Sequence, residues 1–109
     1  MSRHAAPDAI SLFIAGVMNS DHASIDRALA LSVVAVQDEE RYRGAAGIDD
    51  LIATSPVFQD AGQWDVIYAM DSEAVIESPR GDRVQLILDC GRIAFLRVTQ
   101  SESSVVLAA

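Results

Sequence analysis

The sequence predicts an α+β fold in which a strongly bent antiparallel sheet packs on three N-terminal helices. Two observations carry this prediction. Apolar residues recur at helical spacing in three segments of the first half, within residues 10–55. Four runs with strand-like patterns then fill residues 63–99, and short turns join them. Helices followed by sequential strands are typical of domains in which the helices gather on one face of an antiparallel sheet.

The first helix is predicted from spacing. Ile10, Phe13, Ile14 and Val17 recur every three or four residues, so they share one face of a helix that runs to about Met18. We therefore expect this helix to pack one apolar stripe against the core.

A second helix and a first strand follow. Asp21 can cap a helix over residues 22–31. Residues 33–36 form a β-branched run, and charged residues dominate 38–43. We expect a strand that leaves the core and becomes polar.

A third helix of about two turns is expected after residues 44–47, with Ile48 and Leu51 in its apolar stripe. Pro56 forbids its continuation, because proline lacks a backbone N–H and clashes with the preceding turn. We expect residues 57–62 to form a loop.

Four strands are expected at residues 64–70, 73–78, 83–88 and 92–99. The connections between them are short and rich in Asp, Gly, Pro and Ser, which reverse turns prefer. Strands joined by such short turns pair antiparallel, since parallel neighbours need a crossover of a dozen or more residues. We therefore expect an antiparallel meander.

The length of 109 residues leaves room for one hydrophobic core, so we expect a single domain over residues 1–109. Residues 100–109 are predicted to be either a tail or an additional edge strand. No apolar run reaches the roughly 20 residues that cross a bilayer, and the N-terminus lacks the apolar core of a secretory signal. We expect a cytoplasmic protein.

Charge and composition exclude several classes of partner. The chain has eleven Asp and five Glu against eight Arg and no Lys, for a net charge of −8. Such a surface repels phosphate backbones and anionic lipids, so we expect neither nucleic acid nor membrane as a partner. Cys90 is the single cysteine, and His4 and His22 are the only histidines. Their spacing matches no metal motif, and we expect no metal and no cofactor.

Several short motifs carry a resemblance to a known family. They are the segment Phe-Ile-Ala-Gly-Val-Met-Asn-Ser-Asp at 13–21, the strand at 33–38, Arg-Gly at 43–44 followed by Gly-Ile at 47–48, and Gly-Arg-Ile at 91–93. In these segments the chain resembles the nuclear transport factor 2-like superfamily, in its SnoaL-like and ketosteroid isomerase-like branch. The resemblance implies a cone-shaped sheet, a cystatin-like roll, closed by three helices around an apolar cavity. It also implies a homodimer, and a flat sheet or parallel neighbours would count against it.

The resemblance does not carry over a complete set of catalytic groups. In ketosteroid isomerase-like members a first-helix Tyr donates to the oxyanion, but here Phe13 occupies that position, and the late-strand acid falls at Val84. Without those donors an enolate is not stabilised, so that isomerisation is not expected. The position of the base falls on Gln37, or on Asp38 with a shift of one residue, and such a shift exchanges the two faces of a strand.

Two carboxylates are the candidate catalytic groups. Asp38 is the candidate base if the shifted alignment holds. Glu77 could act as an acid or base if it faces inward, where burial would raise its pKa. Its neighbours Val75 and Ile76 favour opposite faces, so the pattern leaves the orientation of Glu77 open.

Aromatic residues are the candidate walls of the cavity. Trp64 and Tyr68 are expected on one strand face, either lining a ligand cavity or making core or dimer contacts. Tyr42 lies between two arginines, either at a pocket mouth or on a solvated surface. His22 and Asp26 have the spacing of a surface pair on the second helix. The predicted pocket-lining residues are Phe13, Val17, Tyr42, Trp64, Tyr68 and Leu86.

Two functions from different classes fit these observations. The first is a small-molecule-binding protein with a compact apolar ligand, with any acid–base chemistry of isomerase, cyclase or hydrolase type carried by Asp38 or Glu77. The second is a non-catalytic dimerisation or protein-interaction module whose outer sheet face is buried against a copy of itself. Apolar residues on both faces of 33–36 and 86–88 motivate the second.

Overall fold

The computed structural model describes residues 8–100, which form three α-helices, one 3-10 helix and a six-stranded sheet. The predicted α+β class and the order of helices and strands are confirmed, while any role of residues 101–109 lies outside the described residues. In chain order the elements are α1 (Asp8–Asn19), α2 (His22–Ala28), β1 (Leu29–Gln37), β2 (Glu40–Arg43), α3 (Gly44–Thr54), η1 (Pro56–Gln63, the 3-10 helix), β3 (Asp65–Ala69), β4 (Glu73–Glu77), β5 (Arg83–Asp89) and β6 (Arg92–Thr99).

The sheet is mixed, with the strand order β2-β1-β6-β5-β4-β3. Strands β3 to β6 form the predicted antiparallel meander. Strand β1, however, pairs parallel with β6, so the expectation of antiparallel neighbours throughout was wrong for this pair. The long connection between β1 and β6, which includes α3, η1 and four strands, supplies the crossover that a parallel pair requires.

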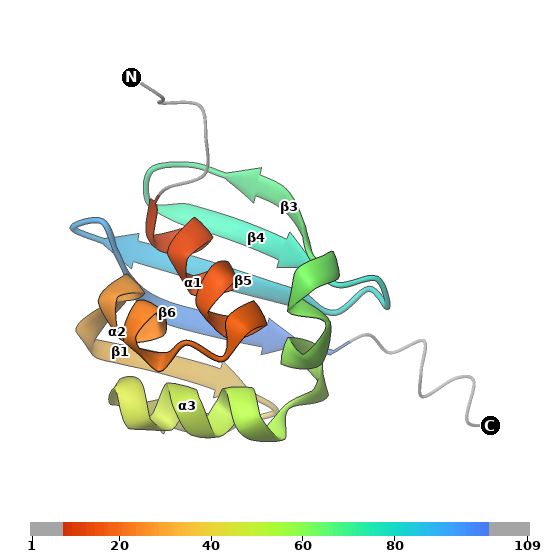
Figure 1. Cartoon of the computed structure of the whole chain (residues 1–109), viewed down its shortest axis with the longest axis horizontal. Coiled ribbons are helices and arrows are strands. Elements are labelled where there is room, and N and C mark those ends of the chain that lie inside the picture. The colour runs from red at the N-terminus through yellow and green to blue at the C-terminus, as the bar shows by residue number, and fades with distance from the viewer. Residues whose placement is uncertain (1–7, 101–109) are drawn as a thin grey trace.

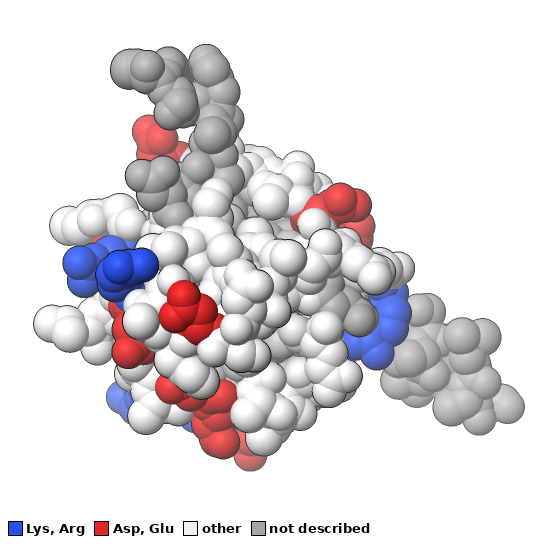
Figure 2. Space-filling model, in the orientation of Figure 1, with Lys and Arg blue, Asp and Glu red and all other residues white. Residues whose placement is uncertain are grey.

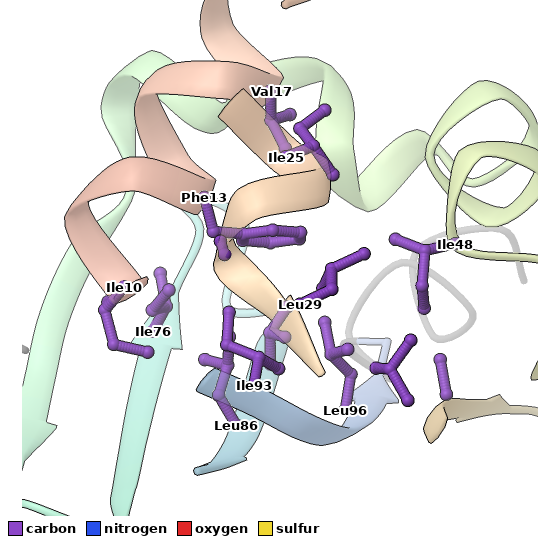
Figure 3. Close-up of a cluster of buried hydrophobic side chains, with 14 of the residues drawn as sticks. Ile10, Phe13, Val17, Ile25, Leu29, Ile48, Ile76, Leu86, Ile93 and Leu96 are labelled. Atoms are coloured by element: carbon purple, nitrogen blue, oxygen red, sulfur yellow. The ribbon is translucent and has the colours of Figure 1, made fainter. Parts of the chain in front are cut away.

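All three α-helices lie on one face of the sheet (Figure 1). Apolar side chains from helices and strands meet between the two layers, as Figure 3 shows for Ile10 and Phe13 of α1 and Ile76, Leu86 and Ile93 of the sheet. Each of these five side chains has no exposed surface. Burial of this apolar area is the main stabilising contribution to the fold.

Helix α2 is shorter than expected, because it ends at Ala28 and β1 begins at Leu29. The sequence analysis extended this helix to residue 31. Leu29 is buried and lies beside Ile93 of β6, so pairing in the sheet overrides the helical propensity of the segment. Leu31 consequently points to solvent and is 97% exposed.

A hairpin joins β1 and β2 where the sequence predicted one strand that becomes polar. Asp38 and Glu39 both have positive φ, 52° and 71°, and Gln37 pairs with Glu40 across them. This is the conformation of a two-residue type I′ turn. The usual sequence signal for that turn is a glycine in second place, which Glu39 replaces.

The expected loop at 57–62 is the 3-10 helix η1. The hydroxyl of Ser55 accepts a hydrogen bond from the backbone N–H of Val57 at 3.4 Å and caps it. The indole N–H of Trp64 donates to the carbonyl of Val57 at 3.3 Å, and its ring packs on Phe58 at 5.5 Å between centroids. The 3-10 helix is therefore held by its own side chains, and Phe58 and Trp64 pack against the core.

A register shift in β3 separates Trp64 from Tyr68. Trp64 packs against the buried core, whereas Tyr68 pairs with Val75 and is 40% exposed. The prediction that both residues share one strand face was wrong, because a bulge exchanges the faces that follow it.

None of the helices in the described segment 8–100 has the length and apolar character needed to cross a membrane.

Candidate functional site

A cleft of about 460 Å³ lies among α1, α2, α3 and η1, on the helical side of the molecule. No strand contributes to the lining found for it. Its floor is shared with the core, since Val17, Ile25 and Phe58 belong to both. The apolar lining residues are Val17, Met18, Ile25, Ile52, Ala53 and Phe58, and the polar ones are Ser20, His22, Asp49 and Gln59.

Gly16 allows α1 and α2 to approach closely beside this cleft. A Cβ at this position would lie 2.7 Å from Cγ1 of Ile25 and 3.2 Å from the carbonyl oxygen of Asp21. The backbone N–H of Asp21 donates to the carbonyl of Gly16 at 2.8 Å, after Ser20 turns the chain with a φ of 54°. A tight reversal thus brings the start of α2 against the end of α1.

Asp21 caps α2 and so fixes the residue that follows it. One carboxylate oxygen of Asp21 accepts from the backbone N–H of Ser24 at 3.3 Å, and the other accepts from the Ser24 hydroxyl at 2.8 Å. These two bonds, the hydroxyl bond first, hold the pKa of Asp21 below its ordinary value. The cap places His22, the first residue of α2, at the cleft.

His22 meets Asp49 of α3 across the cleft. Nδ1 of His22 lies 3.2 Å from a carboxylate oxygen of Asp49, and the two side chains are 69% and 37% exposed. The sequence analysis paired His22 with Asp26 on its own helix. The partner that the structure provides is 27 residues away in the chain, so no local spacing could reveal it.

Seen from the helical side, the surface is largely uncharged, with acidic side chains among the uncharged ones and basic side chains toward the edges (Figure 2). Within residues 8–100, no group of three or more His, Cys, Asp or Glu side chains has an arrangement that could hold a metal ion. The polar chemistry that the structure places at the cleft is therefore that of the His22–Asp49 pair, with Ser20 and Gln59 beside it.

The structure does not bring the two predicted catalytic carboxylates together. Asp38 is exposed in the turn after β1. Glu77 lies at the end of β4, which two strands separate from β1 in the sheet, and accepts from Nε of Arg83 at 3.2 Å. Neither residue is among those that line the cleft, and their catalytic role stays a prediction.

The orientation of β1, which the sequence left open, is settled by its register. Ala35 and Gln37 pair with the buried residues Leu96 and Val98, so they face the interior. The amide oxygen of Gln37 accepts from the hydroxyl of Ser55 at 2.7 Å. A neutral amide is not a proton acceptor, so Gln37, the inward-facing residue at the end of β1, cannot serve as a general base.

The six predicted pocket-lining residues have different surroundings. Val17 lines the cleft. Phe13 and Leu86 are fully buried in the core, Trp64 is half-buried beside it, and Tyr68 lies on the outer face.

Tyr42 is half-buried at the edge of the core, and its hydroxyl donates to the Glu40 carboxylate at 3.1 Å. Desolvation of the hydroxyl, followed by this hydrogen bond, raises the pKa of Tyr42. Of the six, the structure therefore places only Val17 in the lining found for the cleft.

The fold matches several solved structures, although no protein-family model matches the sequence and the curated proteins include no significant match. A candidate polyketide cyclase from Sinorhizobium meliloti is 16% identical, with a TM-score of 0.64 over 91% of this chain and 100% of its own. An NTF2-like protein of unknown function from Cytophaga hutchinsonii is 10% identical, with a TM-score of 0.62 over 91% and 92%. A candidate ketosteroid isomerase from Kribbella flavida is 14% identical, with a TM-score of 0.59 over 88% and 77%. The chain thus has the fold of nuclear transport factor 2-like proteins, and its one parallel strand pair does not count against that fold.

Proposed function

We propose that the protein binds a compact, predominantly apolar small molecule in the cleft between its helices. The observation that carries this proposal is the cleft itself, whose volume of about 460 Å³ lies in the range of small-molecule sites. Most of the lining side chains are apolar, and a few polar groups stand among them. This combination is typical of sites where apolar contact supplies affinity and polar groups fix orientation.

The similar structures support the proposal more weakly. Two of them carry names that refer to polyketide and ketosteroid substrates. Since one fold hosts many functions, this likeness cannot choose a ligand for the present chain. The class of ligand must therefore be inferred from the residues that line the cleft.

The charge of the protein further limits the kind of ligand that the cleft can bind. The net charge is −8, and Asp49 lies in the lining. An anionic ligand would meet repulsion both from the surface as a whole and from this carboxylate. We therefore propose an uncharged ligand. Because Asp38 and Glu77 are not among the residues that line the cleft, the proposal is one of binding and does not include acid–base catalysis.

Blocking the cleft tests the proposal. Ala53 is exposed and lines the cleft, so Ala53→Trp should fill it without disturbing the core. The matched control is Ala45→Trp, an exposed position on the same helix that is not in the lining. Thermal-shift screening with steroid-like, terpenoid and polyketide-like molecules should identify a stabilising class for the wild type, and chemical-shift mapping should place it in the cleft.

We expect Ala53→Trp to abolish the stabilisation and Ala45→Trp to retain it. Absence of stabilisation by every ligand class would count against the proposal. Equal binding by both variants would place the ligand elsewhere.

We propose homodimerisation through the outer sheet face as a second candidate function. In residues 8–100 the three α-helices lie on the opposite face (Figure 1). An uncovered face of an antiparallel sheet is usually polar. Here it carries a group of half-buried apolar residues, which are Val34, Val36, Val75, Ile87 and Phe95.

Phe95 lies near the middle of this face, with the guanidinium of Arg97 at 5.6 Å from its ring centroid. Phe95→Glu should therefore dissociate a dimer, whereas Leu31→Glu, at a fully solvated position, should not. Analytical ultracentrifugation at micromolar concentration measures both. A monomeric wild type would contradict this second candidate.

A further inference from the structure

We propose that the cleft selects ligands that carry a phenolic hydroxyl, which donates its hydrogen bond to Nε2 of His22. This inference rests on the proposed function and names the chemical class of its ligand. It assigns His22 as a specificity-determining residue and Asp49 as the positioning residue that orients its ring. The observations behind it are the contact between these two side chains and their place in the lining of the cleft.

The contact with Asp49 determines which nitrogen of His22 is the acceptor. An ionised carboxylate has no proton to donate, so the 3.2 Å contact is a hydrogen bond only when Nδ1 carries the hydrogen. In the neutral imidazole the other nitrogen, Nε2, then holds the lone pair. In this neutral form, with Nδ1–H held by Asp49, His22 presents Nε2 as a hydrogen-bond acceptor to a ligand in the cleft.

The two residues come from separate helices, which makes the arrangement a property of the fold. His22 is held at the start of α2 by the Asp21 cap, and Asp49 lies in the middle of α3. The cleft lies between these helices, and Ile25 and Ile52 also line it. A ligand with an apolar body on these side chains would have its polar end available to His22.

The charge of the ligand decides which hydrogen-bond donors could pair with Nε2 of His22. A carboxylic acid is ionised near neutral pH and would be repelled by Asp49, which lies beside His22. An aliphatic alcohol is uncharged but is a weaker donor than a phenol. A phenol combines an uncharged ground state with an acidic O–H and an apolar ring. Ser20 and Gln59 can both donate and accept, so they do not discriminate between a hydroxyl and its ether.

A matched pair of probes tests the inference, namely 4-ethylphenol and 4-ethylanisole, which differ in whether the oxygen can donate. We expect the wild type to bind the phenol roughly fivefold more tightly in NMR titrations, the factor that one neutral hydrogen bond typically gives. His22→Phe keeps an aromatic ring but removes the acceptor, so the two probes should bind it equally. His22 is exposed at a helix start, so this variant should fold.

The role of Asp49 is tested against a matched carboxylate. Asp49→Asn no longer enforces the hydrogen on Nδ1, so the preference for the phenol should fall by at least half. Asp26→Asn removes an exposed carboxylate of α2 that is not in the lining, so it should leave the preference unchanged. Equal loss in both variants would overturn the positioning role, because it would indicate a general effect of charge.

The outcomes separate this inference from the proposed function. If the wild type binds both probes in the cleft with equal affinity, the selection of phenols is overturned while the binding function stands. If His22→Phe keeps the preference, the acceptor lies elsewhere and the inference is wrong. If the wild type binds neither probe and no ligand of the wider screen, the binding function fails and this inference fails with it.

Discussion

The molecule has two apolar regions to compare, namely the interior between the helices and the sheet, and the cleft among the helices. Apolar side chains line both regions, and Val17, Ile25 and Phe58 belong to both. In the interior, helix residues face strand residues, and Phe13 and Leu86 have no exposed surface. In the cleft the lining found comes from helices and the turn at Ser20, without any strand, and about 460 Å³ stays open. The difference indicates that open space arises where the sheet no longer supplies side chains opposite the helices.

The largest expected effect tests whether the interior is packed. Phe13→Ala removes a fully buried ring that contacts Phe58 edge to face, with 6.4 Å between centroids. We expect the free energy of unfolding to fall by about 3–5 kcal/mol, because the deletion loses apolar burial and leaves a cavity. Urea denaturation measures the change. A loss below about 1 kcal/mol would show that the interior already holds space, as a ligand cavity there would require.

The next effect tests the close contact between Gly16 of α1 and Ile25 of α2, which lies between the two regions. Gly16→Ala would place a methyl group 2.7 Å from Ile25 Cγ1 and 3.1 Å from the backbone N of Ile25, so α2 must shift. We expect a destabilisation of about 1–3 kcal/mol, as is usual for overpacking. Chemical-shift changes around His22 in NMR spectra should accompany it, since the cleft lies beside this contact.

Gly62→Ala is the control for this variant. A Cβ at Gly62 would meet only the flexible end of Met18, at an ordinary distance of 3.5 Å. We expect its stability to stay within about 0.5 kcal/mol of the wild type. Equal costs at the two glycines would mean that the approach of α1 to α2 does not depend on Gly16.

Much of the interior could be predicted from the sequence, because its signals are local. Helical spacing identified Phe13 as inward-facing, and short turns identified the antiparallel meander that buries Leu86. Three features lacked a local signal. The parallel pairing of β1 with β6 joins distant segments, the turn at Asp38 and Glu39 lacks glycine, and the bulge before Tyr68 exchanges the faces of β3.

The candidate site was harder to predict than the fold. Apolar periodicity shows which residues are buried, but it does not show where packing ends and an open space begins. The sequence therefore assigned a cavity to the interior that Phe13 and Leu86 occupy. The His22–Asp49 pair needs the docking of α2 on α3, and no pattern within either helix encodes that contact.

A smaller effect concerns the pH dependence of stability that comes from Asp21, the residue that caps α2 beside the cleft. Hydrogen bonds from Ser24 lower the pKa of Asp21 in the folded state, so the unfolded state binds more protons in the acid range. The cap therefore stabilises the protein fully above the unfolded-state pKa and loses this contribution as the pH falls through the lower, folded-state pKa. Urea midpoints measured from pH 6 to pH 2 should fall less for Asp21→Asn than for the wild type. Identical profiles would show that the cap carries no charge-dependent stability.

The last comparison locates the boundary between the two regions at two adjacent residues, of which Met18 has the smaller expected effect. Val17 is 9% exposed and belongs to the core and the cleft, whereas Met18 lines the cleft and is 54% exposed. We expect Val17→Ala to cost about 2 kcal/mol, from two buried methyl groups and the space they leave. Met18→Ala should cost less than about 0.5 kcal/mol, because its side chain is largely solvated and alanine favours the helix. If urea denaturation gives both variants the same cost, the core extends beneath Met18, and the cleft would then be a surface irregularity of one continuous packed layer.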